Sequence, residues 1–219
     1  MGADIKFCGL TRAVDAEYAA SIGAAYVGVI FAGGPRLQTS ESARDVLRNV
    51  PRYIQRVGVF ADQSTEEIAR IATDIELDVV QLHGATDVAR IDALRADFTG
   101  EIWPVIRAKN GVLPDGTLSL AKAGDGLLLD AFVDGTLGGT GVALPWKQMA
   151  PALRALRGEY DTTIVLAGGL TPENVGAAIA ALSPDIVDIS SGVEHSPGLK
   201  DHARMLAFRD AVTHASILT

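Results

Sequence analysis

In the stretch Thr163-Ile164-Val165-Leu166-Ala167-Gly168-Gly169-Leu170-Thr171-Pro172, an apolar run passes through a glycine turn into the start of a helix. The run predicts a buried strand, and Thr171 before Pro172 predicts a capped helix N-terminus. The same order recurs where Ile186–Ile189 precedes Ser190-Ser191-Gly192-Val193. Turns with few side chains leave backbone N–H groups free to bind an anion, and the loops after strands seven and eight of (β/α)8 barrels commonly hold a phosphate. Together with a third glycine-rich turn, Gly138-Gly139-Thr140-Gly141, these turns predict a barrel with a phosphorylated ligand.

Eight compact runs rich in Val, Ile and Leu predict strands along the chain. They are Ile5–Phe7, Tyr26–Phe31, Arg56–Phe60, Val79–Leu82, Ile102–Ile106, Leu127–Leu129, Thr163–Leu166 and Ile186–Ile189. Continuous apolar runs are typical of strands buried on both faces, as in parallel sheets. Helix-like segments separate them, and one begins at Ser64-Thr65-Glu66-Glu67 with the spacing of a capping box. We therefore predict an α/β protein with one (β/α)8 barrel domain over residues 1–219.

An open, doubly wound sheet also alternates strands with helices. Such sheets often carry a glycine-rich dinucleotide fingerprint after the first strand, whereas Cys8-Gly9-Leu10-Thr11 stands there in this chain. The sequence of a P-loop is also absent. The closed barrel is therefore favoured over the open sheet.

The chain has a formal net charge of −8, from 19 Lys and Arg against 27 Asp and Glu. This balance argues against partners such as nucleic acid or an anionic membrane surface, which favour basic stripes. Cys8 is the only cysteine, so an intramolecular disulfide is excluded. No leader precedes the first predicted strand, and no run approaches ~18 apolar residues. We expect a cytoplasmic protein that does not enter a membrane.

Polar residues that follow barrel strands face the active site. Cys8 follows the first predicted strand and Asp130 the sixth, so strands seven and eight separate them in a closed barrel. A thiol and a carboxyl on either side of a bound phosphate are suited to acid and base catalysis on a sugar phosphate. Lys6 and the loop amides are the candidates for stabilising a Cys8 thiolate. His83, after the fourth strand, is a candidate substrate contact. Asp188 is expected either to orient neighbouring groups or to cap the last strand.

Metal and cofactor chemistry has little support in the residue pattern. No second histidine shares a metal-ligand spacing with His83. Moving a proton between adjacent carbons requires only an acid and a base. We therefore expect no metal site.

Further motifs extend over nearly the whole chain. They are Lys6–Thr11, Arg56–Phe60, Gln81–Gly84, Leu128–Asp130, Gly138–Gly141, Gly168–Val175, Val187–Glu194 and Pro197–His202. In these segments the chain resembles the phosphoribosylanthranilate isomerases of tryptophan biosynthesis. Several matching motifs in the same order make the resemblance specific.

The resemblance implies an Amadori rearrangement, in which N-(5-phosphoribosyl)anthranilate becomes 1-(2-carboxyphenylamino)-1-deoxyribulose 5-phosphate without a cofactor. It implies that Asp130 is the general acid for ring opening and that Cys8 is the general base at C2′. Arg36 matches the family's arginine for the anthranilate carboxylate, a role that suits a planar, bidentate donor. Gly169, Ser190 and Ser191 match phosphate-binding positions of the family, and the glycine turns add Gly139 and Gly168 to the predicted substrate-binding residues.

The chain departs from the family pattern at two places. Gly33-Gly34 precedes Pro35-Arg36 where the family usually carries a longer segment with a lysine, and paired glycines loosen such a loop. Val142 follows Gly141 where many relatives carry a polar or basic residue. The placement of Arg36 is therefore the open point of the predicted site.

Two other functions remain as alternatives at this stage. The related isomerase of histidine biosynthesis performs the same chemistry with aspartates as acid and base, so Cys8 argues against it. A non-catalytic phosphometabolite-binding protein is the second alternative, and the paired acid and base argue against that. We expect a monomer or homodimer whose partner is a phosphorylated small molecule.

Overall fold

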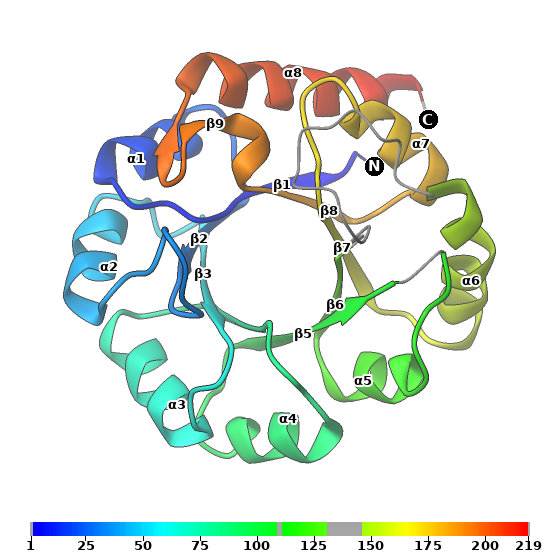
Figure 1. Cartoon of the computed structure of the whole chain (residues 1–219), viewed down its shortest axis with the longest axis horizontal. Helices are drawn as coiled ribbons and strands as arrows, with labels where there is room; N and C mark the ends of the chain where they lie inside the picture. The colour runs from blue at the N-terminus through cyan, green and yellow to red at the C-terminus, as the bar shows by residue number, and fades with distance from the viewer. Residues whose placement is uncertain (1, 109–110, 131–145, 219) are drawn as a thin grey trace.

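The computed structural model describes residues 2–108, 111–130 and 146–218. Its strands close into a parallel barrel in the order β1 to β8, with β1 paired to β8. Figure 1 looks down this barrel and shows the helices as a ring around the strands. The predicted (β/α)8 barrel is confirmed, and the open sheet is excluded.

The barrel strands agree with the predicted runs to within one residue at each end. They are β1 (Asp4–Phe7), β2 (Tyr26–Ile30), β3 (Gln55–Phe60), β4 (Val79–Leu82), β5 (Glu101–Arg107), β6 (Gly126–Asp130), β7 (Thr163–Ala167) and β8 (Ile186–Ile189). The helices are α1 (Ala13–Ser21), α2 (Ser40–Leu47), α3 (Thr65–Asp74), α4 (Val88–Arg95), α5 (Thr117–Ala123), α6 (Trp146–Glu159), α7 (Val175–Leu182) and α8 (His202–Leu218).

A short segment between β8 and α8 was not predicted. It begins with a 3-10 helix, η1 (Ser191–Val193), and continues as an antiparallel pair, β9 (Glu194–Ser196) and β10 (Leu199–Lys200). Thr11 Oγ1 donates a hydrogen bond of 2.6 Å to the Gly198 carbonyl, so the tip of this hairpin is held to the loop after β1. The hairpin therefore belongs to the same end of the barrel as the predicted site.

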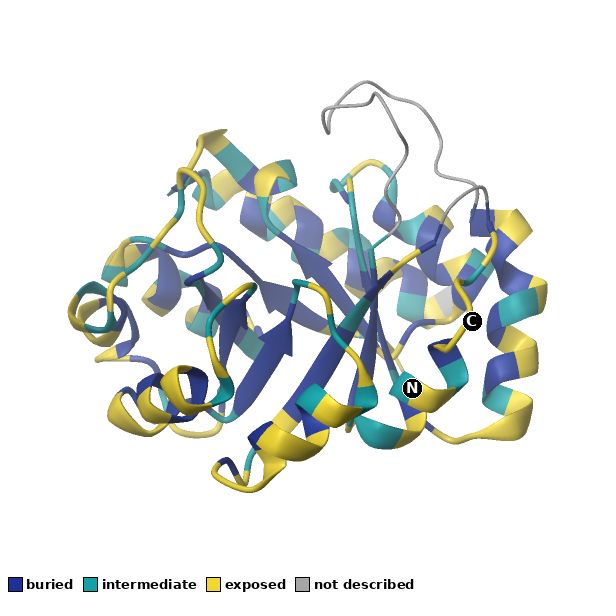
Figure 2. Ribbon diagram, turned by 60° about the horizontal axis from the view of Figure 1, so that its bottom comes forward, coloured by how far each residue is buried: buried dark blue, intermediate teal, exposed yellow. Residues whose placement is uncertain are grey.

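Apolar side chains cover both faces of the strands. Inside the barrel lies a cluster made by Val57, Val79, Trp103, Leu128, Val165 and Ile186. A larger cluster joins the outer face of the barrel to the helices and includes Ile68, Leu153 and Phe208. Figure 2 shows the strands buried and the exposed residues gathered on the helices and loops. Burial on both faces explains why the strand sequences are continuously apolar.

One predicted helix start is confirmed and another is wrong. Ser64 Oγ accepts a hydrogen bond from the Glu67 N–H and caps α3 as predicted. Thr171 does not cap α7, which begins only at Val175. Asn174 Oδ1 instead accepts the Thr171 N–H at 2.8 Å, and its amide donates to the Gly169 carbonyl at 2.9 Å. Because Asn174 binds back to the preceding loop, an extra turn forms before the regular helix.

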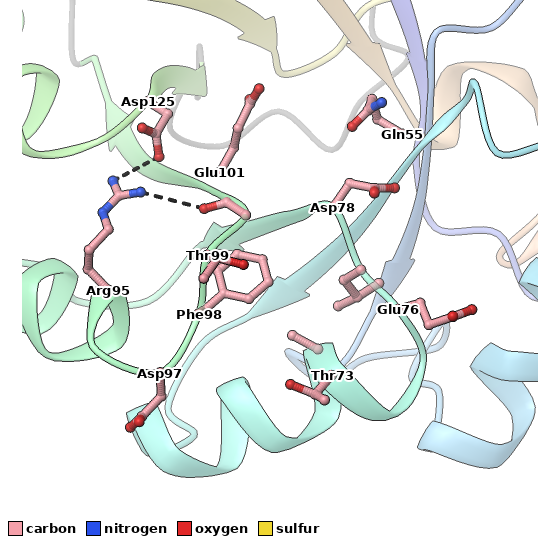
Figure 3. Close-up of a pocket in the computed structure, with 13 residues that line it drawn as sticks. Gln55, Thr73, Glu76, Asp78, Arg95, Asp97, Phe98, Thr99, Glu101 and Asp125 are labelled. Atoms are coloured by element: carbon pink, nitrogen blue, oxygen red, sulfur yellow. Dashed lines mark hydrogen bonds and ion pairs between the residues drawn. The ribbon is translucent and has the colours of Figure 1, made fainter.

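Three aspartates fix the register at the amino-terminal end of the barrel, each directly before an even-numbered strand. Their pairs are Asp78 with Arg56, Asp125 with Ile102 and Asp185 with Ile164. Each carboxylate accepts the partner's backbone N–H at 2.7 or 2.8 Å. Each aspartate N–H donates to the same partner's carbonyl at 2.9 or 3.0 Å. Figure 3 shows Asp78 and Asp125 among the residues that line a pocket at this end of the barrel.

We expect Asp125→Ala to lower the free energy of unfolding by about 1–3 kcal/mol, because it leaves the Ile102 N–H without its acceptor. The change also frees Arg95, whose Nη2 lies 2.8 Å from the Asp125 carboxylate. Urea unfolding followed by circular dichroism measures the loss. Asp97→Ala is the matched control, because it removes an exposed carboxylate from the pocket that Asp125 also lines (Figure 3). The free energy of unfolding of this variant should change by no more than about 0.5 kcal/mol. Equal losses in the two variants would contradict this role.

Candidate active site

A cavity of about 360 Å³ lies at the carboxyl ends of the strands, a volume typical of small-molecule sites. The predicted site residues that line it are Cys8, Arg36, His83, Asp130, Gly168, Gly169, Ser190 and Ser191. Gly139 and the rest of the Gly138–Gly141 turn fall within residues 131–145, outside the described part of the chain, as does Val142. The described site residues thus line one cavity, although they lie far apart in the sequence.

Cys8 is held at the rim of the barrel by its own backbone. Its N–H donates to the Ile189 carbonyl at 2.8 Å, which continues the β1–β8 ladder by one residue. Gly28 in β2 leaves room for the thiol, since a Cβ at that position would lie 3.1 Å from Cys8 Sγ. The side chain is buried and lines the cavity. The thiol is therefore fixed against β2 and faces the enclosed space.

The electrostatic environment of Cys8 contains opposing charges. Burial raises the pKa of the thiol, and the Asp188 carboxylate raises it further. The ammonium groups of Lys6 and Lys200 act in the opposite direction, because a positive charge favours the thiolate. Burial prevails, so the pKa of Cys8 lies above its ordinary value. Lys6 thus stands where the sequence predicted a cation for the thiolate, and Lys200 is a second one that was not predicted.

Asp130 is the last residue of β6, and its carboxylate lies 3.9 Å from His83 Nε2. Burial raises the pKa of Asp130, while His83 and Arg107 partly offset the effect. Burial also lowers the pKa of His83, which keeps the imidazole neutral near pH 7. A carboxyl with a raised pKa retains its proton to higher pH and is a better general acid. His83 borders this carboxyl, and no described group lies within hydrogen-bond distance of its Nδ1.

Lys6 and Asp188 form a buried ion pair beside the cavity. Lys6 is 0% exposed and donates to Asp188 Oδ2 at 2.8 Å and to Gln81 Oε1 at 3.0 Å. The other carboxylate oxygen, Asp188 Oδ1, is buried without a hydrogen-bond partner among the described residues. Gln81 was missed as a site residue, although a glutamine inside an otherwise apolar strand was the available signal. Asp188 orients Lys6, in keeping with the role expected for it.

The two predicted phosphate turns have backbone that favours glycine. Gly168 and Gly169 have φ of +93° and +63°, and side chains rarely adopt this region. Gly192 packs so closely on β7's loop that a Cβ there would lie 2.0 Å from the Leu170 carbonyl oxygen. Ser190 and Ser191 follow β8 and line the same cavity. Small residues at these positions let the two loops approach each other and leave space for an anion between them.

Arg36 reaches the cavity from the loop between β2 and α2. Gly33 and Gly34 take positive φ values of +99° and +81°, which turn the chain before Pro35. The guanidinium is fixed by a bidentate ion pair with Glu194, with Nε to Oε1 at 2.7 Å and Nη2 to Oε2 at 2.5 Å. The paired glycines therefore do not leave Arg36 without a defined position.

Within residues 2–108, 111–130 and 146–218, no three His, Cys, Asp or Glu side chains gather as metal ligands would. None of the helices in this part of the chain has the length and apolar character needed to cross a membrane.

Fold and cavity together define a class, the (β/α)8-barrel proteins whose loops at the carboxyl ends of the strands enclose titratable side chains. Comparisons with known proteins narrow this class. A family described as N-(5'-phosphoribosyl)anthranilate (PRA) isomerase matches residues 5–211. The N-(5'-phosphoribosyl)anthranilate isomerase of Pseudomonas aeruginosa strain UCBPP-PA14 is 40% identical over 212 residues, covering 95% of this chain and 94% of the relative. That of Chromohalobacter salexigens is 38% identical over 215 residues, covering 96% and 94%.

Solved structures agree with the sequence relatives. The phosphoribosyl anthranilate isomerase of Thermotoga maritima superposes with a TM-score of 0.87 at 31% identity, covering 97% of this chain and 99% of its own. A structure of such an isomerase in complex with reduced 1-(o-carboxyphenylamino)-1-deoxyribulose 5-phosphate gives a TM-score of 0.83 at 30% identity, with the same coverage. The chain belongs to the N-(5'-phosphoribosyl)anthranilate isomerase family.

We expect Asp188→Asn to lower the pKa of Cys8, because it removes a negative charge that disfavours the thiolate and leaves Lys6 free to favour it. Cys8 is the only cysteine, so the rate of alkylation by iodoacetamide against pH reports its ionisation alone. The alkylation curve of the variant should move to lower pH. Asp92→Asn, an exposed change on α4, is the control and should leave the curve in place. A curve that stays or moves to higher pH in Asp188→Asn would contradict this arrangement of charges.

Proposed function

We propose that this chain catalyses the rearrangement of N-(5'-phosphoribosyl)anthranilate to 1-(2-carboxyphenylamino)-1-deoxyribulose 5-phosphate, with Asp130 as general acid and Cys8 as general base. Membership of the isomerase family supports the reaction. The observation behind this division of roles is that the Asp130 carboxyl and the Cys8 thiol line one cavity with the two glycine turns, whereas the other carboxylate of this cavity, Asp188, is bound to Lys6. Proton transfers at oxygen and at carbon are all that the isomerisation requires.

Asp130 would act first, by protonating the furanose ring oxygen. Cleavage of the bond between this oxygen and C1′ opens the ring and leaves a Schiff base with the anthranilate nitrogen. The raised pKa of Asp130 supports this role, because the acid must carry its proton at the working pH. His83 lies 3.9 Å from this carboxyl, and because burial lowers the pKa of the imidazole, His83 offsets the raised pKa of Asp130 only in part.

Cys8 would then remove the proton from C2′ of the Schiff base. The electron pair of that bond moves into a C1′–C2′ double bond and neutralises the iminium nitrogen, which gives an enolamine. Tautomerisation of the enolamine to the ketone completes an isomerisation in which no atom is gained or lost. Lys6 and Lys200 support this step, because both oppose the effect of burial on the pKa of the thiol.

The two anionic ends of the substrate would bind at separate places. The phosphate would lie between the Gly168–Gly169 turn and Ser190–Ser191, where small residues leave room for an oxyanion. The anthranilate carboxylate would lie at Arg36, which suits a fork of N–H donors. A cytoplasmic location and a monomeric or homodimeric state remain predictions from the sequence.

We expect the purified protein to convert N-(5'-phosphoribosyl)anthranilate without added metal, at a rate that EDTA does not change. The reason is that the acid, the base and both anion contacts come from side chains and backbone of the chain itself. Loss of substrate fluorescence measures the rate. Activity that EDTA abolishes and a divalent ion restores would contradict the mechanism, and absence of turnover would contradict the function.

We expect Cys8→Ser and Asp130→Asn each to lower kcat by about 10²-fold or more, the usual scale for one general acid or base. KM should change little, because neither group is assigned to an anion of the substrate. Steady-state kinetics on both variants check this, and Glu159→Gln, an exposed change at the end of α6, is the control. A Cys8→Ser enzyme with nearly unchanged kcat would assign the thiol to packing alone.

We expect inorganic phosphate to compete with substrate at millimolar concentration, since backbone donors bind a tetrahedral oxyanion whatever is attached to it. Gly169→Val should weaken this competition, because Gly169 has a φ of +63°, which a β-branched residue does not adopt without strain. Inhibition constants for phosphate in wild type and variant give the comparison. Equal constants would place the phosphate site elsewhere.

A further inference from the structure

Glu194 is the side chain on which the position of Arg36 depends. The backbone that follows Arg36 is fixed by hydrogen bonds from the Leu37 N–H to the Gly34 carbonyl and from the Gln38 N–H to the Ile30 carbonyl, so what remains to be positioned is the long Arg36 side chain. Both Nε and Nη2 of the guanidinium donate to the Glu194 carboxylate. The stem of Arg36 lies against Gly9, where a Cβ would come 2.5 Å from Arg36 Cδ. The Glu194 carboxylate thus holds the Arg36 guanidinium, and the missing side chain of Gly9 leaves room for the Arg36 stem.

Glu194 is in turn held by the hairpin β9–β10 that carries it. Its side chain is 4% exposed, and its Oε1 also accepts from Lys200 Nζ at 2.9 Å and from the Gly198 N–H at 3.3 Å. Lys200, 0% exposed at its side chain, also donates to the Ser190 carbonyl at 3.0 Å. Hydrogen bonds from Arg36 and Lys200 outweigh burial and lower the pKa of Glu194. The carboxylate therefore stays ionised and fixed.

The geometry of this ion pair decides which donors of Arg36 remain for a ligand. A guanidinium has two edges that can bind a carboxylate, one formed by Nε with one terminal nitrogen and one formed by the two terminal nitrogens. Glu194 occupies the first edge. One N–H of Nη1 and one N–H of Nη2 are left on the second edge, and Arg36 lines the cavity.

The charges of the group also leave it able to attract an anion. Arg36 and Lys200 contribute two positive charges and Glu194 one negative charge, so one positive charge remains uncompensated within the group. An isolated buried carboxylate beside a carboxylate ligand would repel it. Glu194 avoids this because each of its oxygens is bound to a cation.

We propose that Glu194 is a positioning residue for substrate recognition, which presents the terminal edge of the Arg36 guanidinium to the anthranilate carboxylate while Lys200 holds Glu194 in place. This inference rests on the proposed function, which assigns that carboxylate to Arg36. Arg36 thereby binds two carboxylates, that of Glu194 and that of the ligand. A lysine at position 36 has too few directed donors to bind both in this way. The hairpin that carries Glu194 and Lys200 becomes part of the substrate-recognition machinery.

Two ligands that share a phosphate but differ in the carboxylate test the role of Glu194. Reduced 1-(o-carboxyphenylamino)-1-deoxyribulose 5-phosphate carries both groups, and inorganic phosphate carries only one. Glu194→Gln should weaken calorimetric binding of the reduced product analogue roughly 10- to 100-fold, the scale for a hydrogen bond to a charged group. Phosphate binding should weaken much less, and KM should rise far more than kcat falls. Glu41→Gln, an exposed glutamate on α2, is the control.

The combination with Arg36→Met separates positioning from a purely structural role. If Glu194 acts through Arg36, adding Glu194→Gln to Arg36→Met should cause little further loss of analogue binding. If Glu194 only stabilises the fold, the two losses will add, and both ligands will weaken alike. Either of these results would overturn the proposal.

Arg36→Lys gives a second route if Glu194→Gln does not fold. Its binding of the reduced product analogue should be nearly as weak as that of Arg36→Met, because an ammonium lacks the two planar edges with which a guanidinium binds two carboxylates bidentately. Wild-type affinity in Arg36→Lys would overturn the proposal. Failure of the wild-type protein to turn over N-(5'-phosphoribosyl)anthranilate would contradict the proposed function, whereas normal wild-type turnover with unchanged Glu194→Gln constants would contradict only the role of Glu194.

Discussion

Closure of the barrel by the pairing of β1 with β8 is the constraint on which the site depends. In this register Lys6 lies opposite Asp188, and Phe7 lies opposite Ile189. Neighbouring residues in paired strands point to the same face, so the Lys6 ammonium meets the Asp188 carboxylate at 2.8 Å. The next residue, Cys8, continues the ladder through the Ile189 carbonyl. A shift by one residue would turn these side chains to the other face and separate the thiol from its charged neighbours.

Two buried lysines surround the thiol, and each is paired with a carboxylate. Lys6 is bound to Asp188 and Lys200 to Glu194, so neither charge is buried without a partner. These pairs limit how far the positive charges can favour a thiolate, and burial still raises the pKa of Cys8. The pKa of Asp130 is raised as well. Because the acid needs its proton and the base must lose one, the rate should follow a bell-shaped pH profile whose limbs belong to the pair.

The sequence predicted the barrel because each strand is buried on both faces and so appears as a continuous apolar run. Cys8 and Asp130 were found as site candidates because they follow such runs, and strand ends face the cavity in barrels. Their roles remain proposals. The prediction that Thr171 caps a helix is wrong. The local sequence does not show that Asn174 accepts the Thr171 N–H.

Other features could not be predicted because they arise between distant segments. Glu194 and Arg36 are separated by 158 positions, and only the closed fold brings them together. The strands β9 and β10 are too short to show an alternating pattern, so the hairpin that carries Glu194 and Lys200 was missed. The pairing of Lys6 with Asp188 likewise follows from strand register and not from either motif alone.

The central claim is that the Cys8 thiol removes the C2′ proton. Measuring loss of deuterium from substrate labelled at C2′, for wild type and Cys8→Ala, tests this step directly. If Cys8 is the base, the wild type should show a primary isotope effect, and the rate of deuterium loss should fall by about 10²-fold or more in Cys8→Ala. Deuterium loss at the wild-type rate in Cys8→Ala would contradict it and require another base in the cavity.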